Sequence, residues 1–253
     1  MVFGGAYHRG SRGDFHYVED GAQDSSMADY CRMFAANGIA CFAIDYRLTP
    51  EDPALPQGAR DAVTVPKALL EDPVSPPASL SCGSAWACHR LMRCPGTPTG
   101  RPLSRRSKTS TALDHVRQNA AAYGVAPNRI AIGGFPAGAI TAINLAYGEG
   151  ADVSAVVSLS GSIWGYDVTQ TARRGQPPLL LFAGQQDLPG IRWGNAELAK
   201  QFAAKGMTVE TAWVPGFGHF YPMGAPSLGP GFSRLSAEQT DPRFPEPFTG
   251  LTP

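Results

Sequence analysis

Residues 129–138 read R-I-A-I-G-G-F-P-A-G, and this stretch carries the clearest signal for the class of fold. Its first half is a short apolar run that predicts a buried strand, and the glycines at 133 and 134 allow a tight turn. A helix of small residues follows directly from Ala137. A strand that passes through a tight turn into a helix is the repeating unit of parallel sheets, so the stretch predicts an α/β protein.

Similar units repeat along the chain on both sides of this stretch. Besides 129–133, apolar runs predict strands buried on both faces at 39–44, 153–159, 179–183 and 209–214. Amphipathic patterns with capping signals predict helices at 26–37, 111–123, 137–147 and 195–205. This alternation implies right-handed crossovers and a mostly parallel sheet with helices on both faces. In such a sheet, the loops that leave the carboxyl ends of the strands hold the functional groups.

The charges of the 253-residue chain balance, with 21 Lys and Arg against 21 Asp and Glu. This balance gives no reason to expect a nucleic acid or an anionic membrane as partner. No apolar run reaches the ~18 residues of a membrane span, and residues 1–5 do not resemble a signal peptide. The expected compartment is therefore the cytoplasm, although a missing N-terminal segment could have carried a signal. Five cysteines, an odd count, predict no disulfide framework.

Two stretches differ in composition from the rest of the chain. Residues 73–112 hold six Pro and six basic residues but no Asp or Glu, and they show no period, so we expect a disordered insertion. Its flanks, 62–70 and 113–123, would then form two halves of one helix. Residues 224–253 hold six Pro and four Gly and should be an irregular tail. The predicted α/β domain thus covers residues 1–223, interrupted by the insertion at 73–112.

The predicted insertion contains groups that could bind metal or nucleic acid. Its candidate zinc ligands are Cys82, Cys88, His89 and Cys94. Their spacings do not match the short ligand pairs that preorganise a tetrahedral site, so disordered thiols are the better interpretation. Its basic residues lack aromatic partners for base stacking beyond Trp86. We therefore expect no metal, no cofactor and no nucleic-acid partner.

The stretch 129–138 resembles the nucleophile elbow, G-x-S-x-G, of α/β-hydrolases, with Pro136 at the serine position. Four further motifs, two before this stretch and two after it, occur along the chain in the order that they have in α/β-hydrolases. They are F-G-G-A at residues 3–6, D-Y-R-L-T-P-E at 45–51, G-Q-Q-D ending at Asp187 and G-F-G-H ending at His219. Together they resemble esterases of the hormone-sensitive-lipase and feruloyl-esterase-like groups. The resemblance implies an α/β-hydrolase fold that is truncated at its N-terminus.

For the chemistry, the resemblance implies Ser-Asp-His acyl transfer on a small ester or acyl ligand, with Asp187 as the acid and His219 as the base. The N–H of Gly4 or Gly5 and that of Ala137 would form the oxyanion hole. Pro136 removes the nucleophile itself. The elbow nucleophile also adopts a positive φ, whereas proline holds φ near about −65°, so the elbow must relax or cannot form. We therefore expect a carboxylesterase-type hydrolase that is catalytically impaired.

Each site residue also has an ordinary structural interpretation. Pro136 suits the first turn of a helix, and Asp187 suits an Asx-type turn before Pro189. His219 could be a solvated loop residue, and the two glycines near the N-terminus could belong to a flexible end. Whether these residues meet in the fold decides between the two sets of interpretations.

Three departures from the esterase pattern accompany the missing serine: the lost N-terminal hairpin, the insertion and the Pro-rich tail. They predict a truncated or shifted gene model, or a decaying gene. They also expose an edge of the sheet, which favours self-association. The alternative function is a pseudoenzyme, an α/β-hydrolase-like protein that binds a small molecule or a protein without hydrolysis.

Overall fold

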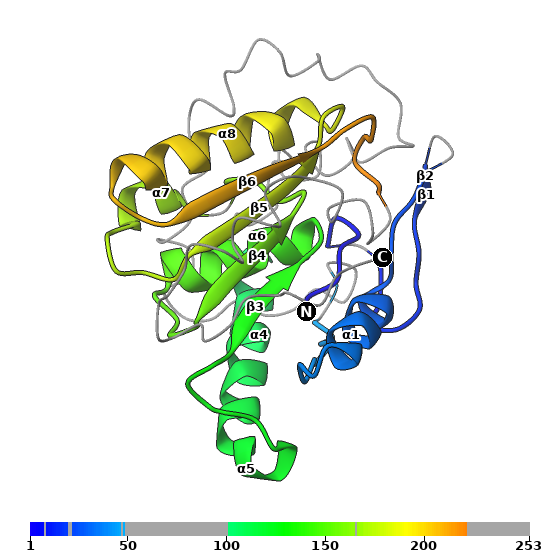
Figure 1. The fold of residues 1–253 in the computed structure, drawn as a ribbon, viewed down its shortest axis with the longest axis vertical. Helices are drawn as coiled ribbons and strands as arrows, with labels where there is room; N and C mark the ends of the chain where they lie inside the picture. Colours follow the sequence, from blue (N-terminus) through cyan, green and yellow to red (C-terminus); the bar gives the residue numbers. More distant parts are fainter. Residues whose placement is uncertain (8, 20–21, 47, 49–100, 165, 222–253) are drawn as a thin grey trace.

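The computed structural model describes residues 1–7, 9–19, 22–46, 48, 101–164 and 166–221. Its central feature is a parallel sheet with the strand order β3-β4-β5-β6 (Figure 1). These strands cover Ala131–Gly134, Ala155–Leu159, Leu179–Gly184 and Val209–Val214. The first and last residues of each strand lie within two residues of the predicted bounds. These four predicted strands and the α/β class are therefore confirmed.

The register of the sheet brings the carboxyl ends of its strands together. Ile132 of β3 lies opposite Val156 of β4, which lies opposite Leu179 of β5, and Leu179 in turn lies opposite Val209 of β6. The first three of these side chains are buried. Because all four strands run in the same direction, the segments that follow them meet at one edge of the sheet.

The N-terminus adds a short piece of strand beside β3. Val2 forms parallel bridges to Gly134 on one side and Ile44 on the other. The Val2 N–H donates to the Gly133 carbonyl at 2.8 Å, and the Phe135 N–H donates to the Val2 carbonyl at 3.2 Å. The Val2 side chain is completely buried. The N-terminal residues are thus fixed directly beside the turn that leaves β3.

The predicted strand at 39–44 is the least regular part of the sheet. It forms a bridge only at Ile44, and Ile39 is 40% exposed, so the prediction that this strand is buried on both faces is wrong. The segment runs along the outer side of residues 1–2, where the Ile44 N–H donates to the Met1 carbonyl at 3.1 Å. In the described part of the chain no strand pairs with its other side, which leaves it at the edge.

Helices connect the strands. Their bounds are α1 Met27–Ala36, α4 Arg101–Gln118, α5 Ala120–Tyr123, α6 Ala137–Ile143, α7 Val168–Thr171 and α8 Pro189–Ala204, with a π-helical turn η2 at Asn144–Gly148. Helix α6 packs on β3 and β4, and α8 packs on β5 and β6. Figure 1 shows α8 at one end of the molecule and α4 with α5 at the other. Helix α8 begins earlier than predicted because Pro189 stands in its first turn, where proline is favoured.

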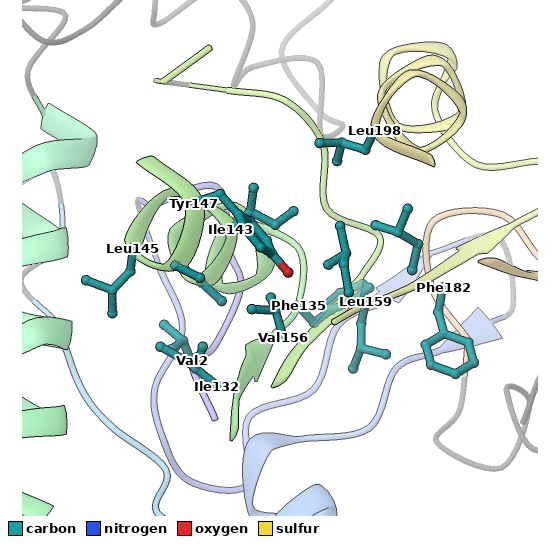
Figure 2. Packing of buried hydrophobic residues seen from close by; sticks show 14 of the residues in the cluster. Val2, Ile132, Phe135, Ile143, Leu145, Tyr147, Val156, Leu159, Phe182 and Leu198 are labelled. Carbon is teal, nitrogen blue, oxygen red and sulfur yellow. The ribbon is translucent and has the colours of Figure 1, made fainter. Parts of the chain in front are cut away.

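The main core fills the space between the sheet and helices α6 and α8. Ile143, Val156 and Leu198 are completely buried, and Figure 2 shows them among the clustered apolar side chains. Tyr147 of η2 meets Phe202 of α8 edge to face, with 4.8 Å between the ring centroids. This packing holds the elements that follow β3 and β5 against one another, which positions the segments at the strand ends.

The predicted insertion at 73–112 is wrong in its last third, because residues 101–112 belong to helix α4. The last proline of the stretch is Pro102, and it lies in the first turn of α4, where its missing N–H is tolerated. Further along the helix Thr109 is 1% exposed. Residues 73–100, the flank at 62–70 and the tail at 224–253 lie outside the described residues.

Two local features were not predicted. Cys31 of α1 and Cys41 form a disulfide, a bond that the expectation of no disulfide framework did not foresee. An odd cysteine count excludes only complete pairing, and it is the packing of α1 beside the edge segment that brings these two residues together.

Strands β1, Val18–Glu19, and β2, Ala22–Gln23, form a small antiparallel hairpin. None of the helices in the described part of the chain combines the length and the apolar character that a membrane span requires.

Candidate functional site

The turn that leaves β3 has Pro136 at its tip. Pro136 has φ −75° and ψ −35°, a helical conformation, and it stands immediately before α6 as the N-cap residue. Its carbonyl accepts the N–H of Ile140 at 3.0 Å, as in a regular first turn. The elbow is therefore relaxed rather than strained, because the pyrrolidine ring excludes a positive φ. The ordinary interpretation of Pro136 as the proline that starts a helix describes its local conformation.

The small residues around this turn allow three pieces of backbone to meet. A Cβ atom on Gly134 or Gly138 would clash with the Val2 carbonyl, so the N-terminal strand packs directly on the turn. A Cβ atom on Gly4 would clash with the Pro136 ring and with the Phe135 carbonyl. The loop that begins at Gly4 thus lies against the residue at the nucleophile position.

This N-terminal loop has a fixed and unusual conformation. Gly5, Ala6 and Tyr7 all have a positive φ, of 96°, 54° and 65°. The buried Tyr7 hydroxyl donates to the Ala137 carbonyl at 2.9 Å, and the buried Tyr46 hydroxyl donates to the Phe3 carbonyl at 3.1 Å. These contacts contradict the flexible-terminus interpretation of the two glycines.

The backbone N–H groups that are expected to form an oxyanion hole lie on the two sides of the contact between the N-terminal loop and the start of α6. They are the N–H groups of Gly4 and Gly5 in the loop and that of Ala137 at the start of α6. In the described part of the chain, no group accepts a hydrogen bond from any of the three. The structure therefore brings the loop and the helix start together and leaves their predicted donors without an acceptor in the described protein.

An acid and a base meet at the same edge of the sheet. Asp187 follows β5 and His219 follows β6, and His219 Nδ1 lies 2.6 Å from Asp187 Oδ1. The Asp187 side chain is completely buried, and that of His219 is 7% exposed. An ionised carboxylate only accepts hydrogen bonds, so Nδ1 carries the proton, and Nε2 of the neutral ring is left as an acceptor. The interpretation of His219 as a solvated loop residue is therefore wrong.

The histidine lies beside the turn that carries Pro136. The rings of Phe135 and His219 have their centroids 5.4 Å apart, and Phe135 also contacts the rings of Phe220 and Tyr221 at 5.9 Å. The structure thus brings the histidine of the predicted triad next to the residue that precedes the nucleophile position. A serine, cysteine or other nucleophile is absent from position 136 itself.

Two buried hydroxyl groups near Asp187 were not predicted as site residues. Ser160 Oγ donates to Asp187 Oδ2 at 2.6 Å and lies 3.0 Å from the Tyr221 hydroxyl. Ser160 directly follows β4, so its place at the end of a predicted strand was a signal that could have found it. Tyr221 lies two residues after His219, and no pattern in the sequence separates it from a core tyrosine.

Asp24 is a second buried carboxyl group in this region. Its Oδ1 accepts the N–H of Tyr17 at 2.6 Å. Burial raises the pKa of Asp24 to about 6, while that hydrogen bond and the electrostatic interactions with His16 and His219 act in the opposite direction. Among the described residues, no group of three or more His, Cys, Asp or Glu side chains could hold a metal ion. Cys82, Cys88, His89 and Cys94 lie outside the described residues.

Several solved structures have a similar fold. Esterase 2 of Thermogutta terrifontis phosphoramylated by tabun is 18% identical with a TM-score of 0.56, and the match covers 86% of this chain and 71% of that chain. The paraoxon-phosphorylated form is 20% identical with a TM-score of 0.54, covering 86% and 70%. The propionate-bound form is 19% identical with a TM-score of 0.53, covering 86% and 71%. At such low identity the likeness shows the fold, which is that of an α/β-hydrolase.

The sequence comparisons identify a family. No curated protein sequence matches the chain. The sequence model of the dienelactone hydrolase family matches residues 99–229, a region that runs from the start of α4 past His219. It includes all four strands of the sheet together with Pro136, Asp187 and His219. Because the match covers just over half of the chain, this protein belongs to the dienelactone hydrolase family.

Proposed function

We propose that the protein is a carboxylic-ester hydrolase by family and by its acid–base pair, and that Pro136 makes it catalytically impaired. The observation that carries this proposal is the buried contact of 2.6 Å between His219 Nδ1 and Asp187 Oδ1 beside a turn that lacks a nucleophile. A carboxylate that orients a histidine in this way prepares the ring to accept a proton through Nε2.

The proposed reaction needs a hydroxyl group at position 136. A serine there would attack the ester carbonyl carbon while its proton passed to His219, and Asp187 would stabilise the resulting imidazolium. The N–H groups of Gly4 or Gly5 and of Ala137 would donate to the oxyanion, each lowering the barrier by roughly 3–4 kcal/mol. Proline supplies no hydroxyl, so the acyl-enzyme cannot form at this position. Loss of such a nucleophile costs on the order of a million-fold in turnover, or about 8 kcal/mol.

The substitution Pro136→Ser tests this proposal. The variant should hydrolyse short p-nitrophenyl esters at least about 100-fold faster than the parent chain, because the acid, the base and the loop are already assembled. Pro136→Ala is the matched control, since it removes the ring without adding a hydroxyl, and it should stay at the parent rate. Adding His219→Gln to the serine variant should abolish the gain.

Three results would contradict the proposal. A folded serine variant that stays inactive would show that the loop or the strand beside it cannot support catalysis. An alanine variant as active as the serine variant would show that hydrolysis does not use the residue at 136. A parent chain that already hydrolyses these esters at rates usual for an enzyme would show that it is not impaired.

A non-catalytic binding function is the second candidate. It is favoured by the relaxed helical conformation of Pro136 and by the close packing of its ring on Gly4, which make a stable site without a nucleophile. Propionate is a suitable acyl probe, because one similar esterase structure has it bound. The unaltered chain should then bind propionate, observed as shifts of the His219 ring signals in an NMR titration. His219→Gln should weaken that binding, which in this variant is followed through the backbone amide signals of the residues around position 219.

The narrower family placement is also a proposal. The segment at 45–51 supports the hormone-sensitive-lipase or feruloyl-esterase-like group, and its Tyr46 hydroxyl donates to the backbone of the N-terminal loop. The cytoplasmic location, the lack of a nucleic-acid partner and self-association likewise stay predictions.

A further inference from the structure

Ser160 lies at the sheet edge where Asp187 and His219 meet, and it is completely buried. Its Oγ is 2.6 Å from Asp187 Oδ2 and 3.0 Å from the hydroxyl of Tyr221. A serine has one hydroxyl proton, and an ionised carboxylate can only accept, so that proton goes to Asp187. The Tyr221 hydroxyl oxygen lies 3.0 Å from Ser160 Oγ and 3.5 Å from the Phe182 carbonyl oxygen. Because the Ser160 proton goes to Asp187, the Tyr221 hydroxyl donates to the nearer of these two acceptors, Ser160 Oγ. The hydrogen bonds therefore run in one direction, from Tyr221 through Ser160 to Asp187.

The two oxygens of the Asp187 carboxylate have different partners. Oδ1 lies 2.6 Å from His219 Nδ1 and accepts the Leu188 N–H at 2.7 Å. Among the described residues, Ser160 is the one donor to Oδ2. A carboxylate held by only one oxygen can rotate about its Cβ–Cγ bond. The bond from Ser160 thus fixes the rotation that directs Oδ1 at His219.

Tyr221 links the hydrogen bonds of Ser160 and Asp187 to the segment that carries His219. It lies two residues after His219 on the same segment and is 1% exposed. Its ring meets that of Phe135 edge to face, with planes 82° apart. Burial raises the pKa of Tyr221 well above its usual value, so the hydroxyl keeps its proton and remains a donor. The segment that supplies the base therefore also supplies the first donor of the hydrogen-bonded series.

The backbone of Ser160 is held in an unfavourable conformation. Its φ is +50°, which is uncommon for a residue other than glycine. The Ser160 N–H donates to the Phe182 carbonyl at 2.7 Å, and the Gly161 carbonyl accepts the side chain of the buried Asn195 of α8 at 2.7 Å. Residues in this region of φ persist where surrounding contacts hold them, often at functional sites. Glycine would adopt this φ without strain, but it would lack the hydroxyl that reaches Asp187.

We propose that Ser160 and Tyr221 are positioning residues, which form a hydrogen-bond relay that orients the Asp187 carboxylate toward His219. The inference deepens the proposed function and rests on it only for the use of the acid–base pair in ester hydrolysis. The relay itself contains no atom of Pro136, so it exists in the chain as it is.

The test observes the hydrogen bond between His219 and Asp187 by NMR in the unaltered chain with 15N-labelled histidine. The Nδ1–H proton of His219, identified by its loss in His219→Gln, should give a downfield signal that is protected from solvent exchange. Ser160→Gly should abolish or broaden this signal while the amide spectrum stays that of the folded protein. Tyr221→Phe, which removes a single oxygen atom, should increase the exchange rate of the same proton.

Ser162→Ala is the matched control. The Ser162 hydroxyl donates to the Gly190 carbonyl at 2.9 Å and belongs to the same loop, but it does not contact Asp187. This variant should keep the signal, whereas a purely structural role of the loop would make the two loop variants, Ser160→Gly and Ser162→Ala, alike. If Ser160→Gly fails to fold, Tyr221→Phe decides the question alone.

The result that overturns the inference is an unchanged His219 signal in folded Ser160→Gly and Tyr221→Phe proteins, or no protected signal in the parent chain. Because the spectrum requires no turnover, an inactive Pro136→Ser protein would contradict the proposed function and leave the relay intact. In an active Pro136→Ser protein, adding Ser160→Gly should lower kcat by about 10- to 100-fold, with KM nearly unchanged, as expected for a misplaced catalytic group. An unchanged kcat would count against the relay.

Discussion

The ring of Tyr17 stacks on Phe220, the residue after His219, with 5.7 Å between the ring centroids and 22° between the ring planes. Tyr17 lies just before β1, so this contact ties the hairpin to the segment that carries the base. A Cβ atom on Gly5 would clash with the Tyr17 hydroxyl, so the same ring also contacts the N-terminal loop. Tyr17 therefore joins three separate parts of the chain around the site.

Two substitutions at Tyr17 should differ strongly in their effects. Tyr17→Ala should lower the free energy of unfolding by about 3–5 kcal/mol, the usual cost of truncating a buried aromatic side chain. Tyr17→Phe should change it by less than about 1 kcal/mol, because the variant keeps the ring that stacks on Phe220 and loses only the hydroxyl. Urea unfolding measures both. Equal losses in the two variants would show that the hydroxyl, and not the ring, stabilises this contact.

Asp24 should make stability fall as the pH rises. Burial raises its pKa to about 6 in the folded chain, against about 4 in the unfolded chain. The folded state then binds more protons between these values, so the free energy of unfolding decreases from about pH 4 to about pH 6. Above that window the ionised carboxylate costs about 2–3 kcal/mol.

Asp24→Asn checks this pH dependence. Asparagine keeps an oxygen to accept the Tyr17 N–H but does not ionise, so the variant should be more stable than the parent at about pH 7.5 and not at about pH 4. Urea unfolding at the two pH values gives the comparison. Exposed Asp152→Asn is the control and should behave like the parent at both. The interpretation fails if Asp24→Asn has no advantage at the higher pH.

The disulfide between Cys31 and Cys41 should stabilise the edge of the sheet. It closes a loop with a sequence separation of 10 residues, for which the loss of chain entropy in the unfolded state predicts about 2–3 kcal/mol. Reductant should therefore lower the urea midpoint of the parent. A double variant, Cys31→Ser with Cys41→Ser, should have that lower midpoint with and without reductant. A parent that does not respond to reductant would show that the bond does not form.

Helix α4 should be required for stability although part of it resembles an insertion in composition. Thr109, Leu113 and Val116 are buried, and α4 packs on α6 and η2. Deleting residues 73–112 should therefore lower the melting temperature relative to deleting residues 73–100 alone. Thermal unfolding of the two deletions decides this, and equal melting temperatures would show that residues 101–112 add nothing to the fold.

The strands and turns of the main sheet were predictable because their signals are local. An apolar run followed by two glycines, Pro136 and a small-residue helix describes β3 and α6 with little dependence on distant residues. Asp187 and His219 were predictable from the resemblance to esterases, and their positions after two parallel strands supported that prediction, because the segments that follow parallel strands lie at one edge of a sheet.

The remaining features depend on contacts between residues far apart in the chain. Ser160 and Tyr221 resemble many serines and tyrosines in sequence, and only the folded chain brings their hydroxyl groups together beside Asp187. Cysteine counting could not pair Cys31 with Cys41, because the pairing depends on where α1 packs. Local patterns and the resemblance to esterases were enough to predict the order of the main strands and helices, the strand-end positions of Asp187 and His219, and the absence of a nucleophile at position 136. The partial exposure of residues 39–44, the disulfide and the partners of Asp187 became evident only in the folded chain, because burial and side-chain contacts depend on which surfaces pack together and not on local sequence.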